Sequence, residues 1–170
     1  MNLVDNNFIW NINGQGVRVA DTDNTIIAHN LFANVSEELV VAKVATDRSL
    51  GGRRLTSKGN RIVNNLIVDQ GKQIITDDPS NLADYNVYIS TNTDKKAAKD
   101  TGEHSLAING EMSFDDDNQL LFWKSKSTLP NVPLVKSCES DFFGRGRTTV
   151  QNVPGPFMGI GNPVTLKLNK

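Results

Sequence analysis

The residues that could do chemistry gather between positions 18 and 58. Asp21 and Asp23 flank Thr22, and Lys43 ends an apolar run. These three are candidate catalytic groups, because carboxylates and amines can act as acids, bases or nucleophiles. The alternative role for the two aspartates is structural, because an aspartate beside a turn accepts hydrogen bonds from nearby backbone amides.

Five basic side chains in the same region could bind an anionic ligand. Arginine holds a carboxylate through two parallel hydrogen bonds, and lysine acts as a compact charge. The sequence therefore predicts a contact face for an acidic polysaccharide, formed by Arg18, Lys43, Arg48, Arg53 and Arg54. Two alternatives stay open: a polysaccharide lyase, in which one such residue removes the proton next to a carboxylate, and a solvated charged loop.

Motifs for metals and cofactors are missing from the sequence. His29 and His104 lie far apart, Cys138 is the single cysteine, and there is no Gly-rich phosphate loop. We therefore expect no metal site and no cofactor. A calcium ion at Asp21 and Asp23 stays open, because calcium prefers carboxylate oxygens.

The chain as a whole has the composition of a folded domain without a charge bias. It has 170 residues, of which 18 are basic and 19 acidic, and a net charge of −1. No basic excess favours nucleic acid, and no apolar stretch is long enough for a bilayer, so we expect neither partner. The first five residues lack the charged and apolar regions of a signal peptide.

An internal repeat positions these residues. Four eight-residue units align on the asparagine at their sixth position, and these asparagines are 23, 35 and 21 residues apart. The units read NLVDNNFI, TIIAHNLF, NRIVNNLI and NLADYNVY, and their reference asparagines are Asn7, Asn30, Asn65 and Asn86. Two apolar columns lie on either side of this polar corner: Val4, Ile27, Ile62 and Ala83, then Phe8, Leu31, Leu66 and Val87.

This pattern predicts an all-β fold, a right-handed parallel β-helix. Asparagine tolerates left-handed backbone conformations at corners, and stacked asparagines bond to one another as a ladder. A period in the low twenties matches one three-sided coil. We expect residues 16–20, 39–44 and 73–76 to stack as a further parallel sheet, and the basic segment 46–59 to project as a loop or hairpin.

Residues 91–170 are predicted to form a cap and a strap packed on the coils of residues 1–90, as one structural domain. Trp123 lies in an apolar run and is expected to pack in a core. The Pro- and Gly-rich end of the chain is expected to be an extended strap. The cap would consist of antiparallel strands at 105–108 and 119–123, turns at 109–110 and 115–118, and a helical turn within 94–100.

The first coil needs a cover, because an uncapped solenoid exposes strand edges and apolar side chains. We therefore expect either missing N-terminal coils, in a longer protein of which this chain is a fragment, or self-association at that end.

Three segments carry a resemblance to a known family. They are Asp84–Tyr88 (DYNVY), Asp141–Arg147 (DFFGRGR) and Pro154–Phe157 (PGPF). With the asparagine corners, they resemble the C-terminal part of bacterial β-helix glycoside hydrolases of the β-xylosidase-like group, within the pectate-lyase-like superfamily. The resemblance implies a catalytic aspartate at position 20 and a catalytic glutamate at position 42. Here these positions are Ala20 and Ala42, and hydrolysis normally needs a carboxylate pair.

The leading hypothesis is thus the C-terminal part of a glycoside-hydrolase-like, carbohydrate-active protein that is weakly active or inactive alone. Its full-length form would be secreted or periplasmic and would act on plant or bacterial polysaccharide. The alternatives are a non-catalytic glycan-binding or structural solenoid, and a polysaccharide lyase on an acidic glycan.

Overall fold

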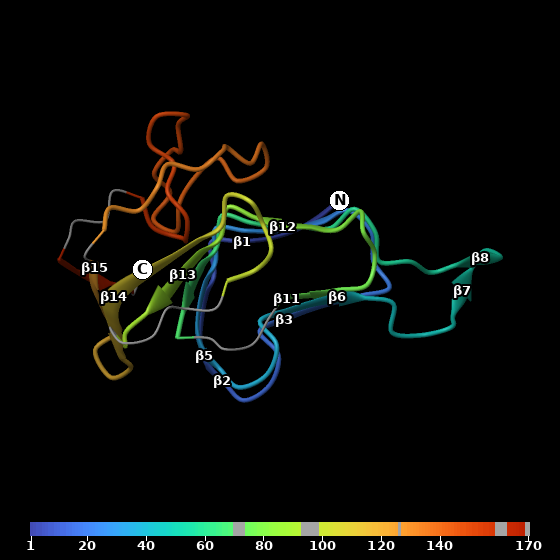
Figure 1. Cartoon of the computed structure of the whole chain (residues 1–170), viewed down its shortest axis with the longest axis horizontal. Helices are drawn as coiled ribbons and strands as arrows, with labels where there is room; N and C mark the ends of the chain where they lie inside the picture. The colour runs from blue at the N-terminus through green and yellow to red at the C-terminus, as the bar shows by residue number, and fades with distance from the viewer. Residues whose placement is uncertain (70–73, 93–98, 126, 159–162, 169–170) are drawn as a thin grey trace.

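The computed structural model describes residues 1–69, 74–92, 99–125, 127–158 and 163–168. Within these ranges the chain is all-β and contains no helix, so no described helix could span a bilayer. About four stacked coils form a right-handed parallel β-helix, as predicted. Figure 1 views the coils nearly end-on, so strands of successive coils overlie one another along three sides.

Each side of the solenoid is a parallel sheet. Sheet A contains β1 (Asn2–Asp5), β4 (Thr25–Ala28), β9 (Arg61–Val63) and β12 (Leu82–Asp84). Sheet B begins with β2 (Phe8–Ile12), β5 (Leu31–Val35), β10 (Leu66–Val68) and β13 (Val87–Ser90). Sheet C contains β3 (Val17–Ala20), β6 (Val40–Lys43) and β11 (Ile74–Thr76), which is the predicted third stack.

The register of the strands confirms the predicted repeat. In sheet A, Val4 pairs with Ile27, and Ile62 pairs with Ile27 and Ala83. The second apolar column is paired in the same way in sheet B. The reference asparagines form a ladder in which each Nδ2 donates to the Oδ1 of the next coil, at 2.9, 3.1 and 3.0 Å.

Each coil turns into sheet B through one left-handed residue. The residue before every ladder asparagine has a positive φ: Asn6 (54°), His29 (56°), Asn64 (60°) and Tyr85 (56°). This conformation turns the chain sharply and, among residues with a side chain, costs least for asparagine and aspartate. At each corner, therefore, one residue provides the left-handed turn and the next residue provides the hydrogen bonds of the ladder.

Apolar side chains form three buried layers around and inside the solenoid. The interior layer takes inward residues from all three sheets, among them Ile27, Phe32 and Val40. A second layer lies outside sheet B, where Leu31 and Leu66 contact side chains of the C-terminal part. A third, smaller layer lies outside sheet A. Residues on both faces of sheets A and B are therefore buried, as expected of a covered parallel sheet.

The C-terminal cap corrects one sequence expectation. The predicted first strand and turn are one strand, β14 (Leu106–Asp115), which includes Asn109 and Gly110. Its start pairs parallel with β13, and its later part pairs antiparallel with β15 (Leu120–Ser125), which pairs with β16 (Val164–Lys167). Asn-Gly makes no hairpin here, because the strand changes partner without reversing. The expected second turn lies at residues 116–119.

The strap, residues 127–158, runs along the outside of the coils (Figure 1). Val135 and Cys138 pack on sheet A, and Phe157 packs on Leu66 outside sheet B. The buried Arg147 guanidinium donates to Asn6 Oδ1 at 2.9 Å and to the Gly155 carbonyl at 3.0 Å. The predicted helical turn falls mostly on residues 93–98, outside the described residues.

Candidate functional site

The outer face of sheet C carries two of the predicted contact residues. Arg18, Val41 and Ile75 are in register across β3, β6 and β11, and Ala20 is in register with Lys43. Arg18 is exposed and Lys43 is half-buried. Because outward residues on adjacent strands two positions apart are separated by about 8 Å, one oligosaccharide could touch both cations. Val41, between Arg18 and Ile75, is 1% exposed, so only part of this surface reaches solvent. We call that part the open face: Arg18, Ala20, Lys43 and Ile75.

The candidate catalytic aspartates hold the base of the projecting hairpin. Asp21 accepts hydrogen bonds from the Ala45 and Thr46 amides, at 2.8 and 3.3 Å, and from the Thr46 hydroxyl at 2.8 Å. Asp23 accepts from the Thr56 hydroxyl and the Lys58 amide. The Ala45 amide and the Thr46 hydroxyl lower the pKa of Asp21, because they stabilise its charged form. The two carboxylates thus fasten both ends of the insertion.

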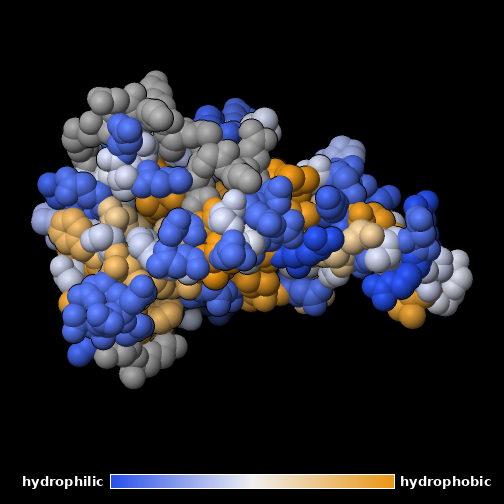
Figure 2. Space-filling model, turned by 90° about the horizontal axis from the view of Figure 1, so that it is seen from below, coloured by the Kyte–Doolittle hydropathy of each residue, from blue (hydrophilic) through white to orange (hydrophobic). Residues whose placement is uncertain are grey.

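The insertion forms a two-stranded hairpin, β7 (Ser49–Leu50) and β8 (Arg53–Arg54). Figure 1 shows it projecting from the corner between sheets C and A, and Figure 2 shows that its surface is mainly hydrophilic, with some hydrophobic atoms exposed at the projecting end. Arg54 pairs with Asp47 at 2.6 Å, and Arg48 lies 4.0 Å from Asp21. Arg53 has no carboxylate partner among the described residues, so it is the hairpin cation most available to a ligand.

The two alanines matched to catalytic acids lie on opposite faces of sheet C. Ala20 is in register with Lys43, whereas Ala42 is in register with Val19. Ala42 is fully buried and belongs to the interior layer, and Ala20 faces outward. Acids at these two positions could not flank one glycosidic bond, because successive side chains of a strand point to opposite faces. The ungapped matching therefore does not describe an active site in this chain.

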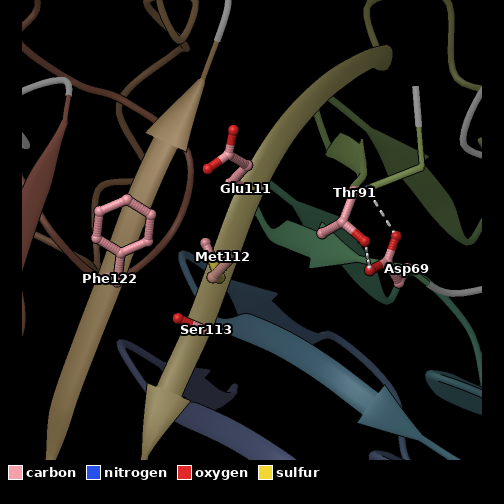
Figure 3. Close-up of a pocket in the computed structure, with 6 residues that line it drawn as sticks. All are labelled: Asp69, Thr91, Glu111, Met112, Ser113 and Phe122. Atoms are coloured by element: carbon pink, nitrogen blue, oxygen red, sulfur yellow. Dashed lines mark hydrogen bonds between the residues drawn. The ribbon is translucent and has the colours of Figure 1, made fainter.

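A hollow of about 340 Å³ lies between the end of β10 and the cap. Its lining includes two carboxylates, Asp69 and Glu111, beside Phe122 and two hydroxyl groups. Figure 3 shows Asp69 turned toward Thr91, while Glu111 points away from both. Asp69 accepts hydrogen bonds from the Thr91 amide and hydroxyl, and Glu111 pairs with Lys124 at 3.0 Å.

Sequence reasoning missed this hollow. Asp69 and Thr91 are 22 residues apart, which is one coil, so they lie on neighbouring coils at the same corner. The repeat spacing could have paired them. Glu111 and Phe122 could not be placed, because the partner change of β14 carries them there.

A further pair of titratable groups joins the last coil to the cap. His104 Nδ1 lies 2.8 Å from Asp84 Oδ2, and the His104 ring stacks on Tyr85 at 4.4 Å between centroids. Asp84 also accepts from the His104 backbone amide. These contacts hold the segment before β14 against the last coil. His29 contacts Asn64 instead, so the two histidines do not form one site.

Groups of metal-ligating side chains do not form in the described ranges, where no three His, Cys, Asp or Glu residues converge. Comparison with family models, curated proteins and solved structures finds no match for the chain.

Proposed function

We propose that this chain is a carbohydrate-binding β-solenoid that holds an acidic polysaccharide along the open face. One observation carries the proposal. The cap and the strap pack on the outer sides of sheets A and B, whereas the outer side of sheet C presents Arg18 and Lys43. Neither cation has a carboxylate within salt-bridge distance among the described residues. A row of sugar carboxylates would supply those partners.

Binding is favoured over cleavage at this face because its carboxylates already have structural partners. Asp21 and Asp23 accept hydrogen bonds from residues at the base of the hairpin. No described hydrogen bond joins either carboxylate to a residue of the open face. Lys43 is a cation beside Ala20 and forms no salt bridge with a described acid. Asp77 lies next to it but accepts a hydrogen bond from the Val44 amide at 2.8 Å, so this carboxylate also has a structural partner. The parallel β-helix also supports, as a proposal, membership of the pectate-lyase-like superfamily and a secreted or periplasmic full-length protein.

Affinity electrophoresis in gels containing polygalacturonate tests the binding proposal. We expect retardation of the wild-type chain, weakening with added salt, and about tenfold weaker binding by the double variant Arg18→Ala/Lys43→Ala. The matched control is Arg61→Ala, which removes an exposed strand arginine from sheet A. Absence of retardation, or an equal loss in the control, would contradict the proposal. A rise in ultraviolet absorbance on the same polymer would show a lyase instead.

Hydrolysis is a second candidate, because two carboxylates line the hollow beside Phe122 (Figure 3). A bound sugar ring could stack on Phe122 and displace the Glu111–Lys124 contact. Release of reducing ends from xylan or polygalacturonate, abolished in both Asp69→Asn and Glu111→Gln, would establish this activity. Equal release by the wild type and both variants would exclude the hollow as its source.

A further inference from the structure

The arginines of the chain differ widely in how firmly the fold holds their backbone. They are Arg18, Arg48, Arg53, Arg54, Arg61, Arg145 and Arg147. A protease that cleaves after arginine needs the backbone on both sides of the bond to leave its hydrogen bonds and extend into the enzyme. Such local opening is easiest in exposed segments with few buried contacts. The contacts of each arginine therefore show where such an enzyme could cut the folded chain.

Four of these arginines lie in backbone that the fold holds firmly. Arg18 and Arg61 belong to strands β3 and β9, which pair within sheets C and A. The Arg145 amide donates to Asp141 Oδ1 at 2.9 Å, its carbonyl accepts from the Asp141 amide at 2.8 Å, and its guanidinium pairs with the same carboxylate at 2.6 Å. Arg147 is 7% exposed. Cleavage at any of these four would require opening of a sheet or of the strap.

The projecting hairpin offers the opposite environment. Every residue from 47 to 54 is exposed, and β7 and β8 pair over two residues each. A two-stranded ribbon this short is marginally stable by itself. Its turn residues, Gly51 and Gly52, both have positive φ, and no described neighbour lies within 4 Å of where their Cβ atoms would be. Opening of the hairpin, which stands clear of the coils in Figure 1, therefore breaks few contacts and exposes no core.

The three arginines of the hairpin are held to different degrees. The Arg48 carbonyl accepts a hydrogen bond from the Leu55 amide at 3.1 Å. Arg54 pairs with Asp47 at 2.6 Å, an exposed contact that contributes little stability in water. Arg53 makes no ion pair or side-chain hydrogen bond among the described residues. The side chains of Arg53 and Arg54 are therefore the most available to the specificity pocket of a protease.

A cut in the hairpin would leave both pieces of the chain attached. Asp21 accepts a hydrogen bond from the Ala45 amide before the hairpin, and Asp23 accepts one from the Lys58 amide after it. The coils on the two sides of the cut also stay paired in all three sheets, through β4 with β9, β5 with β10 and β6 with β11. The cut thus removes one covalent connection and none of the strand pairs of the solenoid.

We propose that the Arg53–Arg54 pair is a cleavage site for an arginine-specific endopeptidase, and that cleavage yields a two-piece solenoid that stays folded. Water hydrolyses the peptide bond after one of these arginines. Its hydroxyl group bonds to the carbonyl carbon and the departing nitrogen takes up the proton, so one piece gains a carboxylate and the other an amine. Cleavage here is independent of the proposed carbohydrate binding, because no residue of the open face lies in the hairpin.

Limited digestion of the folded chain with an arginine-specific endopeptidase tests the site. Mass spectrometry should show that the first products are residues 1–53 or 1–54 and the matching remainder of the chain. The variant Arg53→Lys/Arg54→Lys keeps both charges but loses the specificity residue, and should slow the first cut at least about tenfold. Arg61→Lys is the matched control, because it alters an exposed arginine of a paired strand, and it should be cut like the wild type.

Three outcomes would overturn the assignment. They are resistance of the folded wild-type chain to the enzyme, a first cut at one of the other arginines, and equal rates for the wild type and the double lysine variant.

Size-exclusion chromatography of the digested protein tests whether the pieces stay together. The cut chain should elute with the intact 18.7 kDa chain in native buffer and separate only in denaturant. The urea midpoint of the cut chain should rise with protein concentration, because its unfolding releases two molecules instead of one. Separate elution of the pieces in native buffer would contradict the proposed two-piece solenoid.

Discussion

At the scale of single residues, the corner asparagines combine donors and acceptors in a way that no apolar residue could. Asn30 accepts hydrogen bonds from the amide and Nδ2 of Asn7, and its own Nδ2 donates to Asn65 Oδ1 and to the Val4 carbonyl. Asn30 is fully buried, so each of these bonds satisfies a group that would otherwise be costly to bury. The ladder therefore fixes the stacking of one coil on the next.

His29 occupies the same corner position as Asn6 and Asn64, but it is buried and close to Arg147. Burial, with a further contribution from the Arg147 charge, lowers the pKa of His29 to about 3. The folded-state pKa thus lies below the unfolded value of about 6.5. Protonation favours the unfolded chain, so the stabilisation is complete above pH 6.5 and is lost as pH falls below it.

We predict that the free energy of unfolding falls by about 1 kcal/mol between pH 7.5 and pH 5.5 because of His29 alone. Urea unfolding at the two pH values measures this fall. His29→Asn should largely remove it, because asparagine takes the equivalent corner in two other coils. His104→Gln, the matched control, should keep it. An unchanged pH dependence in His29→Asn would refute this account of the corner.

At the scale of elements, the alternation along β15 decides which of its aromatic residues stabilise the fold. Trp123 is 2% exposed and packs in the layer outside sheet B, whereas its neighbour Phe122 faces the hollow. The cap is attached to the coils by β14 pairing and by this apolar layer. Neighbouring side chains of β15 are therefore expected to differ sharply in how much they contribute to the free energy of unfolding.

We predict that Trp123→Ala lowers the free energy of unfolding by about 3–5 kcal/mol, because it leaves a cavity beneath the cap. Phe122→Ala, one residue away on the other face, should cost about 1 kcal/mol or less. Denaturant unfolding of the two variants measures the difference. Similar losses would mean that the cap does not pack on sheet B through the Trp123 face.

At the scale of the whole molecule, burial increases from the first coil toward the middle coils. Strands β4, β5 and β6 are buried except at Asn34 and Lys43, whereas Val19 is the single buried residue in the three strands of the first coil. Contacts between neighbouring coils hold a solenoid together, and a terminal coil has one neighbour. Its local stability must therefore be lower.

Hydrogen exchange should report this gradient directly. At dilute concentration we expect amides of β1, β2 and β3 to exchange well before those of β4, β5 and β10. Uniform protection across all coils at dilution would show that the first coil is not a weak end.

The sequence by itself determined the coils. Asparagine at the sixth position of each unit, with apolar residues three positions before it and directly after it, is a local pattern that reappears as strand register. The sequence also predicted the projecting hairpin and the strap. It located Arg18 and Lys43 on neighbouring strands, because the repeat aligns those strands.

Only the tertiary structure decided which of these residues are free to act. Asp21 and Asp23 are bound to the base of the hairpin, and Ala20 and Ala42 lie on opposite faces. The course of β14, which leaves its parallel partner and folds over sheet B, created the hollow and covered a face that the repeat alone leaves bare. Repeats encode contacts between equivalent positions, whereas hydrogen-bond partners from an insertion or a cap come from residues outside the repeat.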